Sequence, residues 1–193
     1  MREGTIERSG GFVLFRFERD LAHPVERIWA AVTEPPEIER WTGRRPEIDL
    51  RDGGEYVSYH GDGMRVVDEV LRVEPPRLFE HTFWRHVNPD ARVTWELSAV
   101  GDGCRLRFTH RLSEADIANA LATVAAGADA ELVVSRNAGG WQRLLDGLQR
   151  SLDDERPGQV SAAGVRRGPA RRARPRPSGR APGPPADTTR RPS

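Results

Sequence analysis

Five short links rich in glycine, aspartate, asparagine and proline divide the middle of this 193-residue chain into segments of strand length. Glycine, aspartate and asparagine tolerate the backbone conformations that hairpin turns need. Links this short make consecutive strands run antiparallel. The middle of the chain therefore predicts an antiparallel meander. The links are Asp52-Gly53-Gly54, Gly61-Asp62-Gly63, Pro75-Pro76, Asn88-Pro89-Asp90 and Gly101-Asp102-Gly103.

The last two strands of the meander show the clearest alternation. Along 93–99 and 104–110 every second residue is apolar, apart from His110. This alternation predicts that one face of these strands is buried and the other is exposed to solvent. The segment 64–73 carries apolar residues on both faces, so its orientation stays open. The expected inward residues are Val93, Trp95, Leu97, Ala99, Cys104, Leu106, Phe108 and His110.

A strand and two short helices are expected before the meander. Residues 12–21 alternate toward their end as a strand does. Pro24 then occupies a helix start, and Val25, Ile28, Trp29 and Val32 follow at helical spacing. Pro35-Pro36 ends this helix and starts a second turn, which carries Ile38 and Trp41.

Two further helices are expected after the meander. Ser113 and Asp116 have the spacing of a capping box, for a helix carrying Ile117, Leu121 and Val124. Residues 130–153 predict one long helix with an apolar stripe. The stripe consists of Trp141, Leu144, Leu145, Leu148 and Leu152.

The charge of the chain is split between its body and its end. Residues 156–193 hold ten Arg and one acidic residue, a net charge of +9 that leaves about −8 on residues 1–155. With eight Pro, five Gly and no aromatic residue, 156–193 predict a disordered tail behind one domain over 1–155. The arginines could hold phosphates or lie on the acidic body, but without interleaved aromatic residues nucleic-acid binding is not favoured. We favour a solvated extension with no role.

The compartment is expected to be the cytoplasm. Cys104 is the only cysteine, which excludes an intramolecular disulfide and favours a reducing environment. The N-terminus has no apolar run of signal-peptide length, and polar residues interrupt the apolar stretch 117–134. We therefore expect no membrane insertion.

Seven short segments, taken in order, resemble the helix-grip (SRPBCC/START) superfamily, which includes steroidogenic-acute-regulatory lipid-transfer domains, polyketide cyclases and the birch-pollen allergen. Within it, residues 12–153 are most similar to bacterial relatives of the activator of the heat shock protein 90 ATPase. The resemblance implies an α+β fold: a curved seven-stranded antiparallel sheet, two short helices after the first strand, and a long C-terminal helix over an apolar cavity. The segments are PVERIW (24–29), Trp41, DLRDGG (49–54), VEPPRL (73–78), VTWEL (93–97), RLRFTH (105–110) and GWQRLLDGL (140–148).

The chain departs from the family pattern in two places. The stretch 113–138 is longer than in the shortest relatives, and the basic tail is additional. About 11 residues precede the first predicted strand, too few for the separate N-terminal domain that eukaryotic activators carry.

Eight residues are candidates for contact with a ligand in the implied cavity, because aromatic side chains are suited to binding planar or apolar molecules. Trp95 and Trp29 are more simply explained as core, whereas Trp41 and Trp141 fit the core and the cavity equally. His110 and His81 each admit two interpretations, a polar cavity group or a core histidine that is hydrogen-bonded. The candidates are Trp41, Tyr59, His81, Trp95, Phe108, His110, Trp141 and Leu145.

An enzyme of this kind would use His110, His81 and Glu69 for proton transfer. Asp68 and Glu69 are adjacent, so on a regular strand one of them faces inward, where burial would raise its pKa. A bulge that turns both outward, or a neutralising arginine, is the simpler expectation. No metal or cofactor is expected, because His81 and His86 point to opposite faces and Cys104 is an inward apolar residue.

Three functions compete. We favour a non-catalytic carrier, sensor or stress-response protein that binds a small hydrophobic or aromatic molecule, such as a lipid. The alternatives are a cyclase or dehydrase that uses cavity groups, and a co-chaperone that contacts a large partner. The sequence leaves monomer and homodimer open.

Overall fold

The computed structural model describes residues 4–123 and 129–155. These residues form one antiparallel sheet with the strand order β1-β2-β8-β7-β6-β5-β4-β3. Its strands are β1 (Thr5–Ser9), β2 (Phe12–Leu21), β3 (Glu47–Ile48), β4 (Glu55–Tyr59), β5 (Arg65–Glu74), β6 (Leu78–Thr82), β7 (Arg92–Val100) and β8 (Gly103–Ser113). The helices are α1 (Val25–Thr33), α2 (Pro35–Thr42), α3 (Glu114–Thr123) and α4 (Ala130–Asp154), with a 3-10 turn, η1, at Gly61–Gly63.

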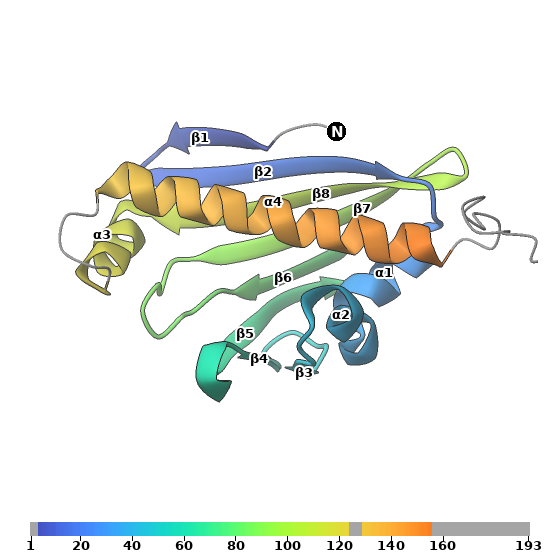
Figure 1. Cartoon of the computed structure of the whole chain (residues 1–193), viewed down its shortest axis with the longest axis horizontal. Helices are drawn as coiled ribbons and strands as arrows, with labels where there is room; N and C mark the ends of the chain where they lie inside the picture. Colours follow the sequence, from blue (N-terminus) through green and yellow to red (C-terminus); the bar gives the residue numbers. More distant parts are fainter. Residues whose placement is uncertain (1–3, 124–128, 156–193) are drawn as a thin grey trace, which may run out of the picture. The chain divides into compact units, whose positions relative to one another are not determined.

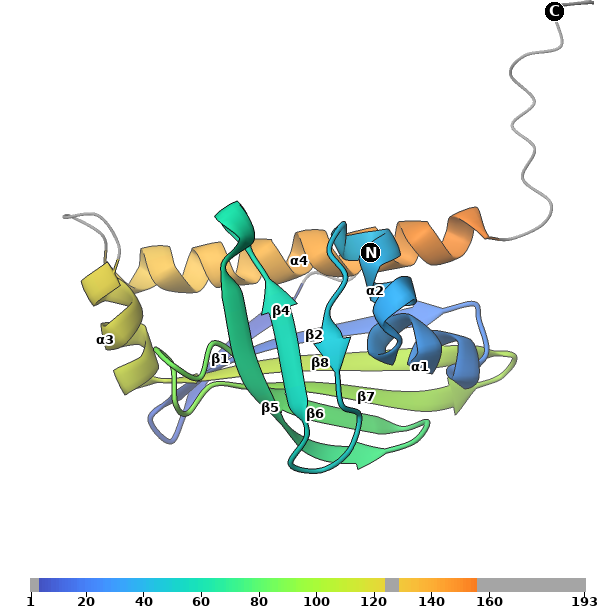
Figure 2. The same ribbon diagram turned by 90° about the horizontal axis from the view of Figure 1, so that it is seen from below.

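The sheet has one helical face (Figure 1). Helix α4 runs along this face, with α1 and α2 near its C-terminal half and α3 near its start. Figure 2 shows the same arrangement from below, with β4 and β5 rising from the sheet toward α4. The predicted α+β helix-grip architecture is therefore confirmed.

The inward face is built from rows of residues in register. Val70, His81, Val93, His110 and Phe15 are partners on five neighbouring strands, from β5 through β6, β7 and β8 to β2. All five are buried, while the residues between them along β7 and β8 are mostly exposed or half-buried. The predicted alternation of these two strands is confirmed up to Leu97, but Ala99, near the end of β7, is exposed.

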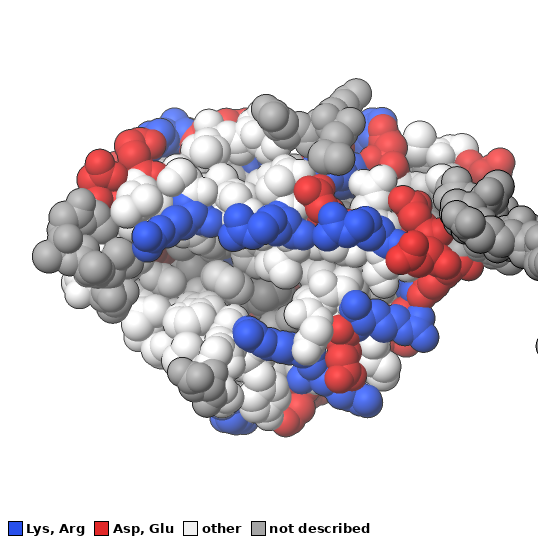
Figure 3. Space-filling model, viewed as in Figure 1, with Lys and Arg blue, Asp and Glu red and all other residues white. Residues whose placement is uncertain are grey.

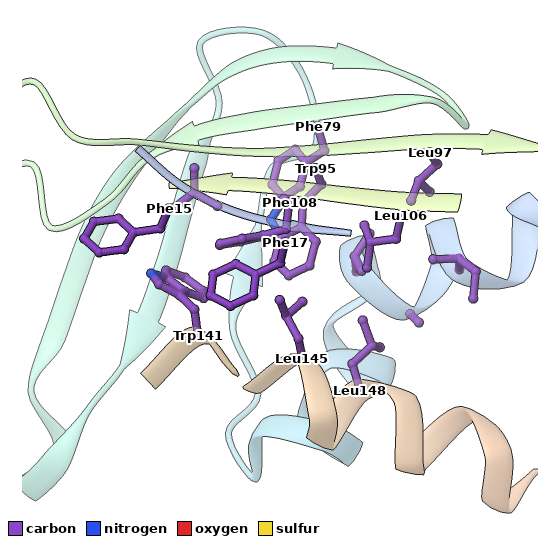
Figure 4. Close-up of a cluster of buried hydrophobic side chains, with 14 of the residues drawn as sticks. Phe15, Phe17, Phe79, Trp95, Leu97, Leu106, Phe108, Trp141, Leu145 and Leu148 are labelled. Carbon is purple, nitrogen blue, oxygen red and sulfur yellow. The ribbon is translucent and has the colours of Figure 1, made fainter. Parts of the chain in front are cut away.

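The aromatic row beside it forms the centre of the core (Figure 4). Phe79, Trp95, Phe108 and Phe17 are register partners across β6, β7, β8 and β2. Helix α4 packs on this row through its predicted apolar stripe, of which Trp141, Leu145, Leu148 and Leu152 are buried.

Side-chain caps begin the last two helices. Asp116 and Ser113 bond each other's backbone N–H groups, at 2.8 and 3.0 Å, as the predicted capping box requires. Asp129 accepts a hydrogen bond from the Leu132 N–H at 2.8 Å and caps α4. These contacts satisfy N–H groups that a helix start leaves without partners.

The described residues differ from the predicted sheet by one strand. Strand β1 pairs with β2 through a hairpin at Gly10 and Gly11, whose φ values are 59° and 77°. All five residues of β1 are exposed, so it has no apolar alternation that could reveal it. The predicted tail over 156–193 and Val124 lie outside the described residues. No helix in the described ranges is long and apolar enough to cross a membrane.

Candidate functional site

A cavity of about 200 Å³ lies between α2, α4 and the rising end of the sheet. Other hollows of about 500 to 640 Å³ occur on the described surface, but each has at most one aromatic residue in its lining. Figure 3 shows a hollow beside α4, on the face that α2 also borders. The cavity is lined by Ile38, Trp41, Thr42, Arg44, Pro46, Tyr56, Ser58, Tyr59, His60, His81, Phe83, Trp95, Trp141 and Leu144.

Tryptophans from three elements hold each other in place at this cavity. The indole Nε1 of Trp41 donates to the carbonyl of Ala31 at 2.9 Å, which fixes the ring of α2 against α1. The rings of Trp41 and Trp95 meet edge to face, with centroids 6.2 Å apart. Phe108 lies behind them and packs against Trp95 and Trp141, at 4.7 and 4.4 Å between centroids. The cavity wall is therefore a rigid aromatic surface.

His81 is a buried polar group in the cavity wall. Its Nδ1 lies 2.6 Å from the carbonyl oxygen of Thr82, which can only accept, so Nδ1 carries the proton. The ring of Tyr56 stacks on the imidazole at 4.5 Å with an interplanar angle of 14°. Burial lowers the pKa of His81 to about 4, against opposing effects of the Thr82 carbonyl and Asp68. The neutral ring leaves Nε2 as a hydrogen-bond acceptor.

His110 is a core histidine and does not line the cavity. Its Nδ1 accepts a hydrogen bond from the indole Nε1 of Trp141 at 2.9 Å, so the proton of the neutral ring is on Nε2. Among the described residues that Nε2 has no hydrogen-bond partner, and the ring of Phe83 meets the imidazole edge to face at 5.1 Å. Burial, and then the neighbouring His81, lower the pKa of His110 to about 3.

The adjacent carboxylates of β5 have opposite positions. Asp68 is buried and accepts hydrogen bonds from the Thr82 hydroxyl and from the N–H groups of Trp84 and Arg85, at 2.9 to 3.0 Å. The expectation of a bulge at this pair, or of an arginine that neutralises the inward carboxylate, is therefore wrong. Three neutral donors satisfy Asp68 instead, and they fix the turn after β6, where Trp84 has a φ of 55°.

Glu69 faces away from the cavity. Its side chain is 44% exposed and pairs with Arg85 at 2.9 Å on the outer side of the sheet. The proposed use of Glu69 as a cavity acid is therefore wrong, because the alternation of β5 directs Asp68 inward instead. Cys104 is buried, as expected of an inward apolar residue, and burial raises the pKa of its thiol.

The predicted contact residues fall into two groups. Trp41, Tyr59, His81, Trp95 and Trp141 line the cavity. The other three are fully buried behind its wall: Phe108, His110 and Leu145.

Nine of the fourteen lining residues are not among the candidates that the sequence suggests, and three of the nine, Tyr56, Phe83 and Arg44, bear on the chemistry of the site. Tyr56 lies on a short strand whose partner, β5, has apolar residues on both faces. Phe83 lies two residues after His81, so the alternation of the strand predicts that both side chains point to the same face. Arg44 lies in the link after α2, where no periodicity assigns a direction. Within the described residues no group of three His, Cys, Asp or Glu side chains is placed to hold a metal ion.

Solved structures of the same fold are known. CalU16 from Micromonospora echinospora is 27% identical, with a TM-score of 0.59 over 79% of this chain and 87% of that one. MLL2253 from Mesorhizobium loti is 22% identical, with a TM-score of 0.59 over 75% of this chain and 99% of that one. A conserved protein of unknown function from Enterococcus faecalis, EF2215, is 16% identical, with a TM-score of 0.61 over 81% and 82%.

No curated protein matches the sequence. The profile of the family described as activator of Hsp90 ATPase homolog 1-like protein matches residues 22–153, which is more than half of the chain. These residues include every side chain of the cavity lining. The chain therefore belongs to the activator of Hsp90 ATPase homolog 1-like family.

Proposed function

We propose that the protein binds a small hydrophobic or aromatic molecule in the cavity, as a carrier, sensor or stress-response protein that does not transform its ligand. The observation that supports this function is the composition of the wall, which joins three tryptophans to Tyr56 and Phe83. Apolar walls with few polar groups are typical of small-molecule sites. The wall has one buried histidine. Glu69, the carboxylate proposed to act with it in proton transfer, is on the other face of the sheet.

Ligand-dependent stability tests this proposal. The protein is stripped of bound molecules, and its thermal unfolding is followed with lipids, sterols and one- or two-ring aromatics. A ligand at 100 times its Kd stabilises the folded state by about 2.7 kcal/mol, which raises the Tm of a chain of this size by roughly 5–10 °C. No shift with any probe would refute a binding role.

A pair of variants separates binding in the cavity from binding elsewhere. Leu144→Trp adds bulk to the lining and should abolish the shift. Leu132→Trp makes the same change on the same helix at an exposed position, and should leave the shift intact.

A proton-transfer enzyme is the second candidate, because Nε2 of His81 is an acceptor in the cavity wall. A base with a pKa of about 4 is far from the value near 7 that suits such catalysis, so this function ranks second. If a ligand is turned over, an unchanged rate in His81→Gln would remove His81 as its base.

The remaining parts of the proposal concern the whole chain. Residues 1–155 would act as one binding domain. Cytoplasmic location is supported by a single, buried, unpaired cysteine.

A further inference from the structure

We propose that the cavity selects an aromatic monoanion of one or two rings, which donates a hydrogen bond to Nε2 of His81 and places its anionic group beside Arg44. This inference rests on the proposed binding function and specifies the ligand class of the same site. Three features carry it: the fixed tautomer of His81, the charge of the lining, and the size of the cavity.

His81 can only accept a hydrogen bond from a guest. Its proton is held on Nδ1 by the Thr82 carbonyl, and its low pKa keeps the ring neutral at neutral pH. Among the described residues no group bonds to Nε2, although the side chain is 4% exposed. A guest without a donor would leave this buried acceptor unsatisfied, whereas a hydroxyl or N–H group would satisfy it.

Tyr56 sets the direction of that acceptor. Its ring lies parallel to the imidazole, so the hydrogen bond at Nδ1 and the stack together fix the plane in which Nε2 points. Burial, and then the nearby Asp68, raise the pKa of Tyr56 to about 12, so its hydroxyl stays neutral. The part of the cavity wall formed by Tyr56 and His81 therefore presents neutral polar groups to the aromatic part of a ligand.

Arg44 gives the lining a net positive charge. It is the one Arg, Lys, Asp or Glu among the described lining residues, and both histidines there have lowered pKa values. Its Nη1 donates to the carbonyl of Tyr59 at 3.3 Å, which is a neutral partner. The carboxylate of Asp68 also acts on the histidines of the lining, but it is buried behind them and bonded to three donors.

Helix α4 extends this positive charge along the mouth. Figure 3 shows basic side chains in a line along the helix, above the hollow. Arg136, Arg143 and Arg150 are exposed and seven residues apart, so they share one side of the helix. A cleft bordered by one sign of charge attracts ligands of the opposite sign.

The volume limits the aromatic part. A dry cavity of about 150 Å³ holds benzene. At about 200 Å³ with an open mouth, this cavity takes one ring fully, or a second ring whose substituent reaches the rim. Long acyl chains and sterols exceed this volume.

Four naphthalene probes test each feature, by calorimetric titration of the full chain. We expect 6-hydroxy-2-naphthoate to bind about tenfold more tightly than 2-naphthoate or 6-methoxy-2-naphthoate, neither of which has a donor. It should bind roughly three- to fivefold more tightly than 2-naphthol, which has no charge, and high salt should erase this second difference.

Matched variants locate the charge effect. Arg44→Gln should reduce the preference for 6-hydroxy-2-naphthoate over 2-naphthol to less than about twofold, the part that the α4 arginines supply. Arg45→Gln removes the same charge from the neighbouring exposed residue, which lies near Glu39, and should keep the preference. Tyr56→Phe retains the stack and should keep the hydroxyl preference.

The results distinguish a failure of the proposed ligand class from a failure of the proposed binding function. Affinities of all four probes within twofold of each other would overturn the ligand class and leave a general apolar binder. A carboxylate preference that is undiminished in Arg44→Gln would overturn the role of Arg44. If neither these probes nor the apolar panel bind at all, both the ligand class and the binding function fail.

Discussion

Lowering the pH from 7 to 5 is expected to destabilise the folded protein through two buried histidines. The pKa of His81 falls from an ordinary 6.5 to about 4, and that of His110 to about 3, mainly because both rings are buried. Below pH 6.5 the unfolded chain takes up protons at these positions and the folded protein does not. The unfolded state then binds more protons, so stability falls as the pH falls.

The magnitude follows from the two pKa values. Between pH 7 and pH 5 each histidine contributes a loss of about 2 kcal/mol. Both together remove about 4 kcal/mol, a large part of the 5–15 kcal/mol by which a typical domain is stable. The window lies above the ordinary pKa values of carboxylates, so these groups add little there.

Urea unfolding at pH 5, 6 and 7, followed by far-ultraviolet circular dichroism, measures this loss. His110→Gln keeps an acceptor for the indole of Trp141 but cannot titrate, so it should lose about half as much stability over the same window. His86→Gln, at an exposed position, should behave like the parent protein. A fall of less than about 1 kcal/mol in the parent would show that the two imidazoles are not held neutral, and would refute the reasoning.

Two further perturbations test the polar contacts of the core, with unfolding free energy at pH 7 as the measurement. Trp141→Phe keeps a ring but leaves Nδ1 of His110 without its donor, and should cost about 1–3 kcal/mol; a neutral result would mean that the hydrogen bond contributes nothing. Asp68→Asn replaces one acceptor oxygen with an NH2 donor that faces the donors of Thr82 and the turn after β6, and should cost about 2–4 kcal/mol, whereas Glu69→Gln on the outer face should change stability by less than about 1 kcal/mol. Equal effects of these two β5 variants would contradict the assigned orientation.

Local patterns are sufficient to predict most of the fold. Strict alternation in β7 and β8 is enough to place Trp95 and His110 on the inward face, because only one face of each strand is apolar. Proline and capping residues likewise set the starts of α1, α2 and α3. Strand β1 is not predictable in this way, because its five residues are all exposed and nothing in their order distinguishes them from a loop.

The site is less predictable because it depends on partners far apart in sequence. The indole of Trp141 reaches His110 across 31 positions, and periodicity carries no information about such a pairing. The carboxylates of β5 show the same limit. Apolar residues occupy both faces of that strand, and only the donors of Thr82, Trp84 and Arg85 show which carboxylate turns inward.

The hydrogen bond between Trp141 and His110 also bears on how a guest reaches the interior. Lifting α4 away from the sheet would break the hydrogen bond between the indole N–H of Trp141 and Nδ1 of His110. Each group left without a partner would cost about 1–3 kcal/mol of free energy, and Leu145 would be exposed as well. Passage between α2 and β4 breaks the exposed contact of Arg44 with Tyr59. Ligand entry between α2 and β4 therefore costs less free energy than entry by detachment of α4. Changes at Arg44 should alter the rate of exchange, and changes at Trp141 the stability of the folded protein.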